Sequence, residues 1–285
     1  MRVFSWNEQR EVDTIMSPND SIKYYKTILR SGLLSIEPQT GHIKAWVGGI
    51  NHKYFKYDHV DQGKRQVGST FKPFVYATAI DRLQKSPCDM IMDSPFTILK
   101  GDNNDKDWTP NNSDGKYRGL VSMKKALANS INTVSARLIH EVGAPAVVEM
   151  AKNLGVTSAI PNRPAIALGA VEITVEEMVA AFSTFANEGV YIKPQLITKI
   201  EDKNGVVIYQ GVEESHDVVN KDVAYSVIKL MEGVTESGTG SRLRWAASAP
   251  SNFLTGVPYN IKGPVAGKTG TSQNNSDGWF IGMVP

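Results

Sequence analysis

The stretch Gln66-Val67-Gly68-Ser69-Thr70-Phe71-Lys72-Pro73-Phe74 decides the fold, because it leads into a helical pattern over residues 71–83. A helix that begins here places Ser69 and Lys72, three residues apart, on one face. A serine hydroxyl is a poor nucleophile until a base takes its proton, and a neutral lysine one turn away can be that base. Burial and a second cation nearby would lower the pKa of the lysine. The helix start also directs backbone N–H groups toward developing negative charge, so the stretch predicts a nucleophilic site.

Two further polar motifs follow in the chain. The triplet Ser130-Ile131-Asn132 falls in a helical pattern over residues 122–140, where its plain interpretation is a polar break, since serine and asparagine are poor helix-interior residues. The run Lys268-Thr269-Gly270-Thr271 contains the single Lys-Thr-Gly of the sequence. On a strand its lysine and glycine face one side and its two threonines the other, which is also typical of an edge strand guarded by a lysine. Each motif alone is weak evidence, because the Ser-x-x-Lys spacing recurs at residues 122–125 and 226–229.

The composition excludes several classes of function. The 285 residues are 41% apolar and 21% charged, which is ordinary for a soluble chain of one large domain or two small ones. The 31 basic and 29 acidic residues nearly balance, which argues against nucleic acid as a partner. A single cysteine, Cys88, allows no intramolecular disulfide, and the five scattered histidines have no metal-ligand spacing. We therefore expect no metal and no cofactor.

The order of the predicted elements favours an α+β fold. Residues 33–37 and 42–47 flank Pro38-Gln39-Thr40-Gly41 as a hairpin, residues 191–200 and 206–209 form a second hairpin, and strands are expected at 263–271 and 278–284. Helices are expected at 122–140, 146–153, 175–187 and 223–234. Residues 84–118 form a long loop, which is usually functional or caps a cleft. Strands at both ends of the chain predict one antiparallel sheet flanked by helices.

The three motifs in this order resemble those of the penicillin-recognising serine acyltransferases. The likeness is more specific than these motifs: the chain looks like the transpeptidase domain of class A (bifunctional, 1A-type) penicillin-binding proteins. Three parts of the sequence carry this resemblance: the first and third motifs with their neighbours, the stretch Ala165-Ile166-Ala167-Leu168-Gly169, and the hairpin 35–49. The likeness covers residues 31–285, and residues 1–30 resemble the linker that precedes this domain. It implies an antiparallel sheet flanked by helices with an all-helical subdomain, as in serine β-lactamases and penicillin-binding transpeptidases.

The resemblance implies catalytic roles for three side chains. Ser69 matches the acylated nucleophile and Lys72 the general base. Ser130 matches the proton relay between the two lysines and the departing amine. The backbone N–H groups of Ser69 and Thr271 match the oxyanion hole. A second lysine close to Lys72 would hold its pKa down, as the mechanism needs.

The remaining motif residues match substrate-binding positions. Asn132 matches a side chain that hydrogen-bonds the substrate amide. Lys268 raises the positive potential of the cleft. Thr269 and Thr271, with Gly270 between them, match residues that bind the terminal carboxylate of the substrate or line its site. The expected partners are therefore peptidoglycan stem peptides, as donor and acceptor, and β-lactam antibiotics.

The implied activity is that of a serine D,D-transpeptidase, with alternatives of the same fold. A D,D-carboxypeptidase uses the same residues with water as the acceptor, and a penicillin-sensing receptor is acylated once and signals. A class A β-lactamase needs a Glu-x-x-Leu-Asn segment, and a class C enzyme needs Tyr-x-Asn; the sequence contains neither. The β-lactamase alternative is therefore disfavoured, whereas the carboxypeptidase stays open.

The family likeness also carries expectations about the protein beyond these residues. A membrane anchor and a glycosyltransferase domain are expected in the parent protein, with the domain at the outer face of the cytoplasmic membrane or in the periplasm. No 18-residue apolar run and no signal peptide occur in this sequence. In the family a further strand and a C-terminal helix follow the strand placed at 278–284. We therefore expect a C-terminally truncated domain, less stable than the full one.

Overall fold

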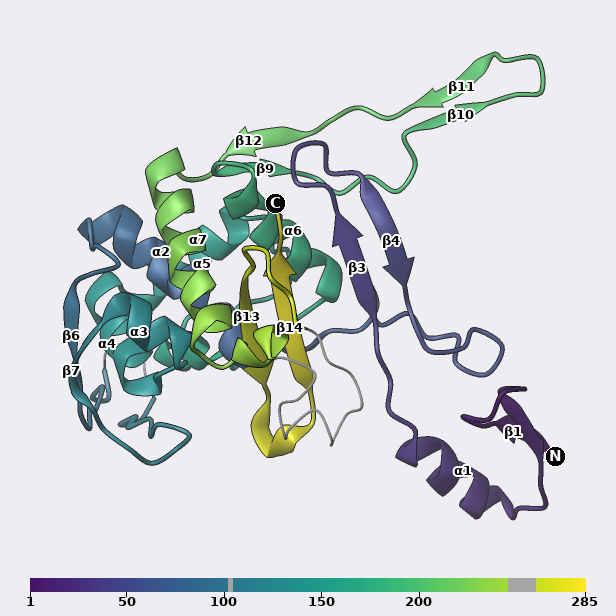
Figure 1. The fold of residues 1–285 in the computed structure, drawn as a ribbon, viewed down its shortest axis with the longest axis horizontal. Helices are drawn as coiled ribbons and strands as arrows, with labels where there is room; N and C mark the ends of the chain where they lie inside the picture. The colour runs from purple at the N-terminus through teal and green to yellow at the C-terminus, as the bar shows by residue number, and fades with distance from the viewer. Residues whose placement is uncertain (102–104, 246–259) are drawn as a thin grey trace.

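The computed structural model describes residues 1–101, 105–245 and 260–285. A body of helices carries two antiparallel hairpins on one side (Figure 1). The longer helices are α1 (Pro18–Thr27), α2 (Lys72–Leu83), α4 (Asn132–Val142), α5 (Ala144–Asn153), α6 (Val175–Ala186) and α7 (Lys221–Glu236), with the short α3 (Met123–Ala128). The 3-10 turns that matter for the site are η1 (Gly68–Phe71) and η2 (Pro164–Leu168).

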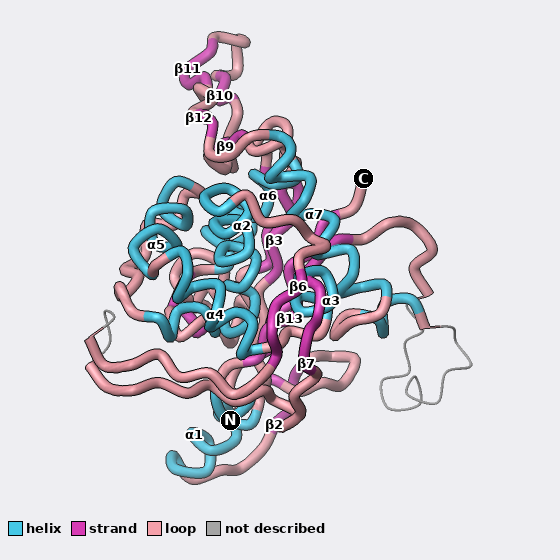
Figure 2. Tube along the Cα trace, turned by 90° about the vertical axis from the view of Figure 1, so that its left-hand side faces the viewer, coloured by secondary structure: helices cyan, strands magenta, loops and turns pink. Residues whose placement is uncertain are grey.

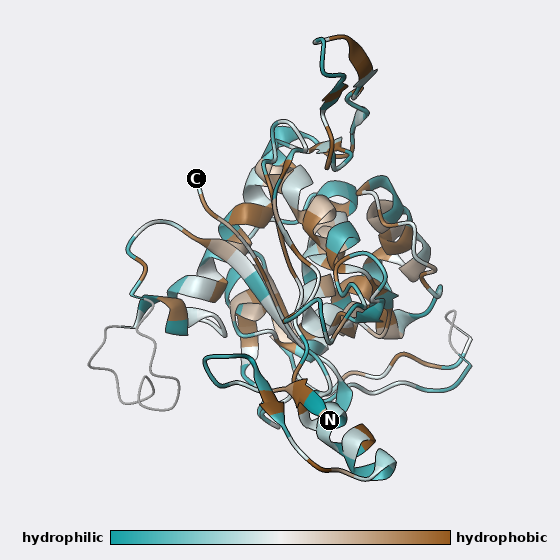
Figure 3. Ribbon diagram, turned by 90° about the vertical axis from the view of Figure 1, so that its right-hand side faces the viewer, coloured by the Kyte–Doolittle hydropathy of each residue, from teal (hydrophilic) through white to brown (hydrophobic). Residues whose placement is uncertain are grey.

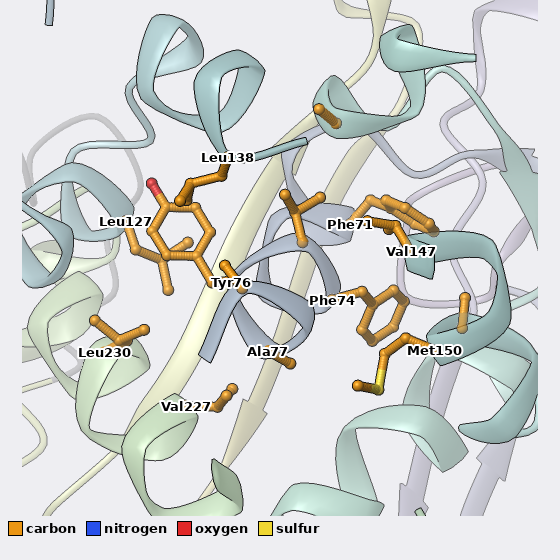
Figure 4. Close-up of a cluster of buried hydrophobic side chains, with 14 of the residues drawn as sticks. Phe71, Phe74, Tyr76, Ala77, Leu127, Leu138, Val147, Met150, Val227 and Leu230 are labelled. Atoms are coloured by element: carbon orange, nitrogen blue, oxygen red, sulfur yellow. The ribbon is translucent and has the colours of Figure 1, made fainter. Parts of the chain in front are cut away.

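Helix α2 is the centre of the core. Every residue from Lys72 to Ile80 is buried, because α4, α5 and α7 pack around the helix. Phe74 and Tyr76 point to opposite sides, Phe74 toward Met150 of α5 and Tyr76 toward Leu127 of α3 (Figure 4). Full burial of such a side chain stabilises the fold by about 2 kcal/mol. The core therefore holds the N-terminal end of α2 rigidly, and this end carries the predicted nucleophile.

The two ends of the chain contribute separate hairpins. Strand β3 (Leu33–Ile36) pairs with β4 (Ile43–Val47), and β13 (Ala266–Thr271) pairs with β14 (Gly278–Met283), both antiparallel as predicted. The prediction of one sheet built from both hairpins is wrong for the described residues, since no ladder joins them. Helix α6 packs against both β3 and β14 instead, so the two hairpins share a helical support rather than hydrogen bonds.

Two sequence predictions in the helical region need correction. The helix expected over residues 122–140 is two helices, α3 and α4, because Ser130 between them has a φ of 55°. A residue in this left-handed conformation cannot continue a right-handed helix. The loop expected over residues 84–118 contains β6 (Met90–Asp93), which pairs with β7 (Gly119–Ser122), and a bridge between Ile98 and Trp108. Its residues 102–104 lie outside the described part of the chain.

The second predicted hairpin is a long arm that projects from the body (Figures 1 and 3). Its base pairs β9 (Val190–Ile192) with β12 (Ser215–Asp217), and its far part pairs β10 (Lys199–Glu201) with β11 (Val207–Gln210). A parallel bridge between His42 and Gln195 attaches the arm to the turn of the β3–β4 hairpin.

Residues 1–30 have secondary structure of their own. Strand β1 (Arg2–Phe4) pairs with β2 (Glu11–Asp13), and α1 follows. Phe4 is fully buried and packs edge-on against Phe55, so this segment is attached to the rest of the chain by an apolar contact. The remaining short strands, β5 (Arg65–Gln66) and β8 (Glu172–Ile173), pair with each other next to η1.

The start of α6 depends on one carboxylate, and this gives a first prediction. Glu177 accepts hydrogen bonds from the backbone N–H of Thr174 and from the N–H and hydroxyl groups of Thr157 and Ser158. Burial alone would raise the pKa of Glu177, but these hydrogen bonds lower it to about 2. Glu177→Gln should therefore reduce the free energy of unfolding by about 1–2 kcal/mol at neutral pH.

The pH dependence of this loss follows from the same shift. A carboxyl group with a lowered pKa stabilises the fold above its ordinary value of 4.5, and this contribution disappears as the pH falls toward about 2. Denaturant unfolding at several pH values should show the difference between wild type and Glu177→Gln shrinking over that range. Glu176→Gln is the matched control, because burial and the nearby carboxylates of Asp61 and Glu177 raise the pKa of Glu176. Equal destabilisation by both variants would contradict the prediction.

Candidate active site

The three sequence motifs meet at the start of α2. Ser69 lies in η1, and Lys72, which is fully buried, is the first residue of α2. The break between α3 and α4 carries Ser130, and β13 carries Lys268. Strand β13 contacts η1, and α4 packs against α2. Figure 2 labels α2, α4 and β13 in the same region of the molecule.

The hydroxyl group of Ser130 lies between two lysine amines. Lys72 Nζ donates to Ser130 Oγ at 3.1 Å and to its carbonyl oxygen at 2.6 Å. Lys268 Nζ donates to the same Oγ at 3.1 Å and to the carbonyl oxygen of Thr269 at 3.0 Å. Lys72 Nζ also donates to Asn132 Oδ1 at 2.7 Å. One network therefore joins residues 72, 130, 132 and 268.

Burial changes the chemistry of both lysines. Lys72 and Lys268 are each 0% exposed. Desolvation, followed by the charge of Lys268, holds the pKa of Lys72 well below its ordinary value. Desolvation lowers the pKa of Lys268 to about 7. An amine whose pKa is lowered in this way is available in its neutral form as a base near neutral pH.

The backbone before Ser69 lies almost against β13. Gly68 has a φ of 53°, and a Cβ atom on it would be 2.4 Å from the carbonyl oxygen of Thr271 and 3.2 Å from its nitrogen. A Cβ atom on Gly270 would be 2.6 Å from the carbonyl oxygen of Val67. Only glycine fits at either position. The backbone of Thr271 therefore lies beside the turn that carries Ser69.

The segment from Gly169 to Val171 also holds the turn that carries Ser69. The N–H of Gly68 donates to the carbonyl oxygen of Gly169 at 3.2 Å, and the N–H of Val67 donates to that of Val171 at 3.1 Å. Gly169 ends η2 with a φ of 75°, and a Cβ atom there would be 1.8 Å from the carbonyl oxygen of Gly68. Trp279 Nε1 of β14 donates to the carbonyl oxygen of Gln66 at 3.0 Å. The sequence did not predict these contacts, although residues 165–169 carried part of the resemblance.

Strand β13 has the two faces that its sequence predicts. Lys268 and Gly270 are buried, whereas Thr269 is partly exposed and Thr271 is exposed. The hydroxyl group of Thr269 lies 2.6 Å from that of Thr239, a residue that the sequence analysis did not single out. The open face of the strand thus presents hydroxyl groups, whereas Lys268 belongs to its buried face.

Two asparagines of the long loop also belong to the site. The carbonyl oxygen of Asn111 accepts from Asn132 Nδ2 at 2.8 Å. The side-chain oxygen of Asn112 accepts from the backbone N–H groups of Asn132 and Thr133 at 2.9 and 3.2 Å. The only sequence signal for them was the unusual length of their loop.

Over residues 1–101, 105–245 and 260–285, no group of three or more histidine, cysteine or acidic side chains is arranged to hold an ion. In the same residues no helix has the length and apolar character needed to cross a membrane.

Comparison with known protein families shows which family the chain belongs to. The family model "Penicillin binding protein transpeptidase domain" matches residues 32–285. This chain belongs to the penicillin-binding protein transpeptidase family. The model of the penicillin-binding protein middle domain matches residues 1–29.

Individual relatives agree with the family. The chain is 35% identical over 259 residues to penicillin-binding protein 1A of Aquifex aeolicus, a match that covers 90% of this chain and 33% of that protein. Penicillin-binding protein 1A of Neisseria flavescens is 33% identical over 264 residues, covering 90% of this chain and 31% of that protein. The chain therefore spans about a third of the length of these relatives.

Solved structures confirm the α+β fold. Penicillin-binding protein 1A from Haemophilus influenzae aligns with a TM-score of 0.77 at 26% identity, over 89% of this chain and 41% of that one. PonA1 from Mycobacterium tuberculosis aligns with a TM-score of 0.72 at 24% identity, over 94% of this chain and 69% of that one. The transpeptidase fold predicted from the sequence motifs is thus confirmed.

Proposed function

We propose that this transpeptidase domain is a serine D,D-transpeptidase that cross-links peptidoglycan stem peptides through an acyl-enzyme on Ser69. The observation that carries the proposal is the Ser130 hydroxyl, held between the buried amines of Lys72 and Lys268. Lys72 follows Ser69 by three residues, at the start of α2. The family match and the relatives named penicillin-binding protein 1A support the proposal. A PonA1 structure described as a complex with penicillin V is a further neighbour of the same fold.

In the first half-reaction, neutral Lys72 accepts the proton of the Ser69 hydroxyl as its oxygen attacks the carbonyl carbon of the penultimate D-alanine. The backbone N–H groups of Ser69 and Thr271 stabilise the oxyanion. Ser130 gives its proton to the departing amine of the terminal D-alanine and regains one from the Lys72 ammonium. The peptide bond breaks, an ester on Ser69 remains, and Lys72 is again neutral.

In the second half-reaction, an amine from a neighbouring strand attacks the ester. Its proton returns through Ser130 and Lys72 to the Ser69 oxygen as the ester breaks. Earlier, in the first half-reaction, the Lys268 ammonium and the hydroxyl groups of Thr269 and Thr271 bind the carboxylate of the terminal D-alanine until that residue departs. One Nδ2 hydrogen of Asn132 is held by Asn111, which leaves the second for the substrate amide. No metal or cofactor takes part.

The proposal extends to the longer protein. Residues 1–30 form a segment that precedes the catalytic domain of residues 31–285, and the parent protein carries a membrane anchor and a glycosyltransferase domain. Peptidoglycan lies outside the cytoplasmic membrane, so the domain works at the outer face of that membrane or in the periplasm. The names of the relatives support this extension.

The test is intact mass after mixing with benzylpenicillin, followed over hours, with peptide mapping of the adduct. A stable one-to-one adduct on the peptide that contains Ser69 supports the proposal. An adduct that clears within seconds while penicillin is consumed would make the chain a β-lactamase. No adduct in a folded sample would contradict the proposal. A donor peptide ending in D-Ala-D-Ala, supplied with and without an acceptor amine, then separates transpeptidation from carboxypeptidase activity by its products.

A pH prediction follows from the coupling of the two lysines. Because the charge of Lys268 helps to lower the pKa of Lys72, Lys268→Met should raise that pKa. The acid limb of the pH–rate profile for acylation is the pH range in which Lys72 loses its proton. This limb should then move to higher pH. Rates with a fluorescent penicillin over a pH series measure this. Lys262→Met removes an exposed lysine and should leave the limb in place. A limb that stays, or moves to lower pH, in Lys268→Met would contradict the assignment of Lys72 as the base.

A further inference from the structure

A buried polar pair, Asp93 and Asn112, lies next to the active site, where Asn112 contacts the backbone of Asn132. Asp93 ends β6 and is 1% exposed, and Asn112 in the following loop is 5% exposed. Asp93 Oδ1 accepts from Asn112 Nδ2 at 2.7 Å and from the Thr133 hydroxyl at 2.6 Å. Asp93 Oδ2 accepts from the backbone N–H of Arg118 at 2.9 Å. Every oxygen of this carboxylate is therefore hydrogen-bonded inside the protein.

The hydrogen bonds fix which way the Asn112 amide points. A carboxylate only accepts hydrogen bonds, so the NH₂ group of Asn112 must face Asp93. The same NH₂ group donates its second hydrogen to the carbonyl oxygen of Lys116 at 2.8 Å. The Asn112 oxygen is then directed at the N–H groups of Asn132 and Thr133. Asn112 has no freedom to rotate without breaking this set.

Helix α4 needs this outside acceptor. Its N-cap is Ile131, whose side chain makes no capping hydrogen bond. The first N–H groups of a helix have no partner within the helix and require one elsewhere. Ser130, immediately before the cap, is held in the unfavourable left-handed region. Asn112 supplies from a separate loop the oxygen that an N-cap serine or aspartate would normally supply.

The start of α4 also sets the geometry around Lys72. Asn132 is the first residue of α4, and its side-chain oxygen accepts from Lys72 Nζ. Its NH₂ group is held by the carbonyl oxygen of Asn111, next to Asn112. A change in the backbone of Asn132 therefore moves a hydrogen-bond partner of the predicted base. The Ser130 hydroxyl, two residues earlier, would move with it.

We propose that Asp93 and Asn112 are positioning residues for acylation: they hold the start of α4 so that Asn132 and Ser130 face Lys72. The inference rests on the proposed function, since it assigns these residues to that reaction. Asp93 fixes the Asn112 amide, Asn112 caps α4, and α4 presents Asn132 to the lysine. Asp93 stays ionised for this purpose: burial would raise its pKa, but hydrogen bonds from Thr133, Asn112 and Arg118 bring it below its ordinary value.

Asn112→Ala is the first test, measured as the acylation rate with benzylpenicillin over a pH series. The variant removes the cap, so a displaced Asn132 and Ser130 should slow acylation on the order of 100-fold. Lys72 also loses an acceptor that favours its charged form, while the charge of Lys268 still acts on it. The acid limb should therefore move to lower pH, opposite to the direction expected for Lys268→Met. A wild-type rate and limb would overturn the proposal.

A paired exchange tests the role of Asp93. Asn112→Asp keeps an acceptor for α4 but sets two carboxylates against each other, so acylation should fall. Adding Asp93→Asn returns the pair to a single charge with a donor facing an acceptor, and most of the rate should return. A double variant no faster than Asn112→Asp would contradict the pairing.

Two matched controls separate positioning from stability. Asp107→Asn removes an exposed carboxylate of the same loop that accepts from the backbone N–H of Lys100, and it should leave rate and limb unchanged. Leu138→Ala opens the buried face of α4 and should lower the melting temperature with the limb in place. If Leu138→Ala moves the limb as Asn112→Ala does, the effect is loss of stability and the proposal fails.

The inference can be separated from the proposed function. Titration of the Lys72 side chain by NMR requires no substrate, and it should show a lower pKa in Asn112→Ala than in wild type. A wild-type chain that is not acylated would contradict the proposed function, whereas an unchanged Lys72 titration would contradict the positioning role.

Discussion

Ser69→Ala is expected to abolish the penicilloyl adduct completely while leaving the fold intact. The substitution removes one oxygen, the atom that the proposed mechanism acylates, from a partly exposed side chain on η1. The turn itself is held by the backbone contacts of Gly68 with Gly169 and β13, which alanine leaves unchanged. Intact mass after hours with benzylpenicillin measures the adduct, and a thermal melt checks the fold.

Two matched serines make this result specific. Ser122 and Ser226 occupy two of the three other Ser-x-x-Lys spacings of the chain, the third being Ser113 with Lys116. Ser122 caps α3 by accepting from the N–H of Lys125, and Ser226 lies on α7. Alanine at either position should leave the one-to-one adduct in place, although Ser122→Ala loses about 1 kcal/mol of helix capping. An adduct that persists in Ser69→Ala would remove Ser69 from the proposed mechanism.

What the sequence predicted well depends on short-range geometry. Ser69 and Lys72 lie one turn apart, and the two faces of β13 follow from strand alternation. The polar triplet at Ser130 was correctly seen as a helix break in its plain interpretation. Its left-handed conformation, which places the hydroxyl between two lysines, was not visible from residue types.

What the sequence did not predict is non-local. Asn112 and Asp93 meet α4 through a loop and a strand that periodicity does not connect to it. The separation of the two hairpins has the same cause, since the order of strands along a chain does not decide which edges pair. The burial of Lys72 and Lys268 is equally hidden, because lysine is almost always an exposed residue.

The burial of Lys72 leads to the last prediction, that Lys72→Met slows acylation by about 10²–10⁴-fold without destabilising the protein. Methionine keeps most of the length of the side chain and removes the proton acceptor. A lysine with a lowered pKa in the fold binds fewer protons than it does in the unfolded chain, so stability rises with pH below its ordinary value of 10.5. Wild type should therefore lose stability relative to Lys72→Met as the pH falls, in parallel denaturant unfolding series.

Lys72→Arg separates proton acceptance from positive charge. Arginine stays protonated in proteins, so it preserves a cation near Ser130 but cannot take the proton of Ser69. It should acylate as slowly as Lys72→Met. The exposed Lys125, in the Ser-x-x-Lys spacing of α3, provides the control, and Lys125→Met should acylate at the wild-type rate. A fast Lys72→Arg enzyme would mean that the charge, and not the neutral amine, is what acylation requires at this position, and another group would then have to accept the Ser69 proton.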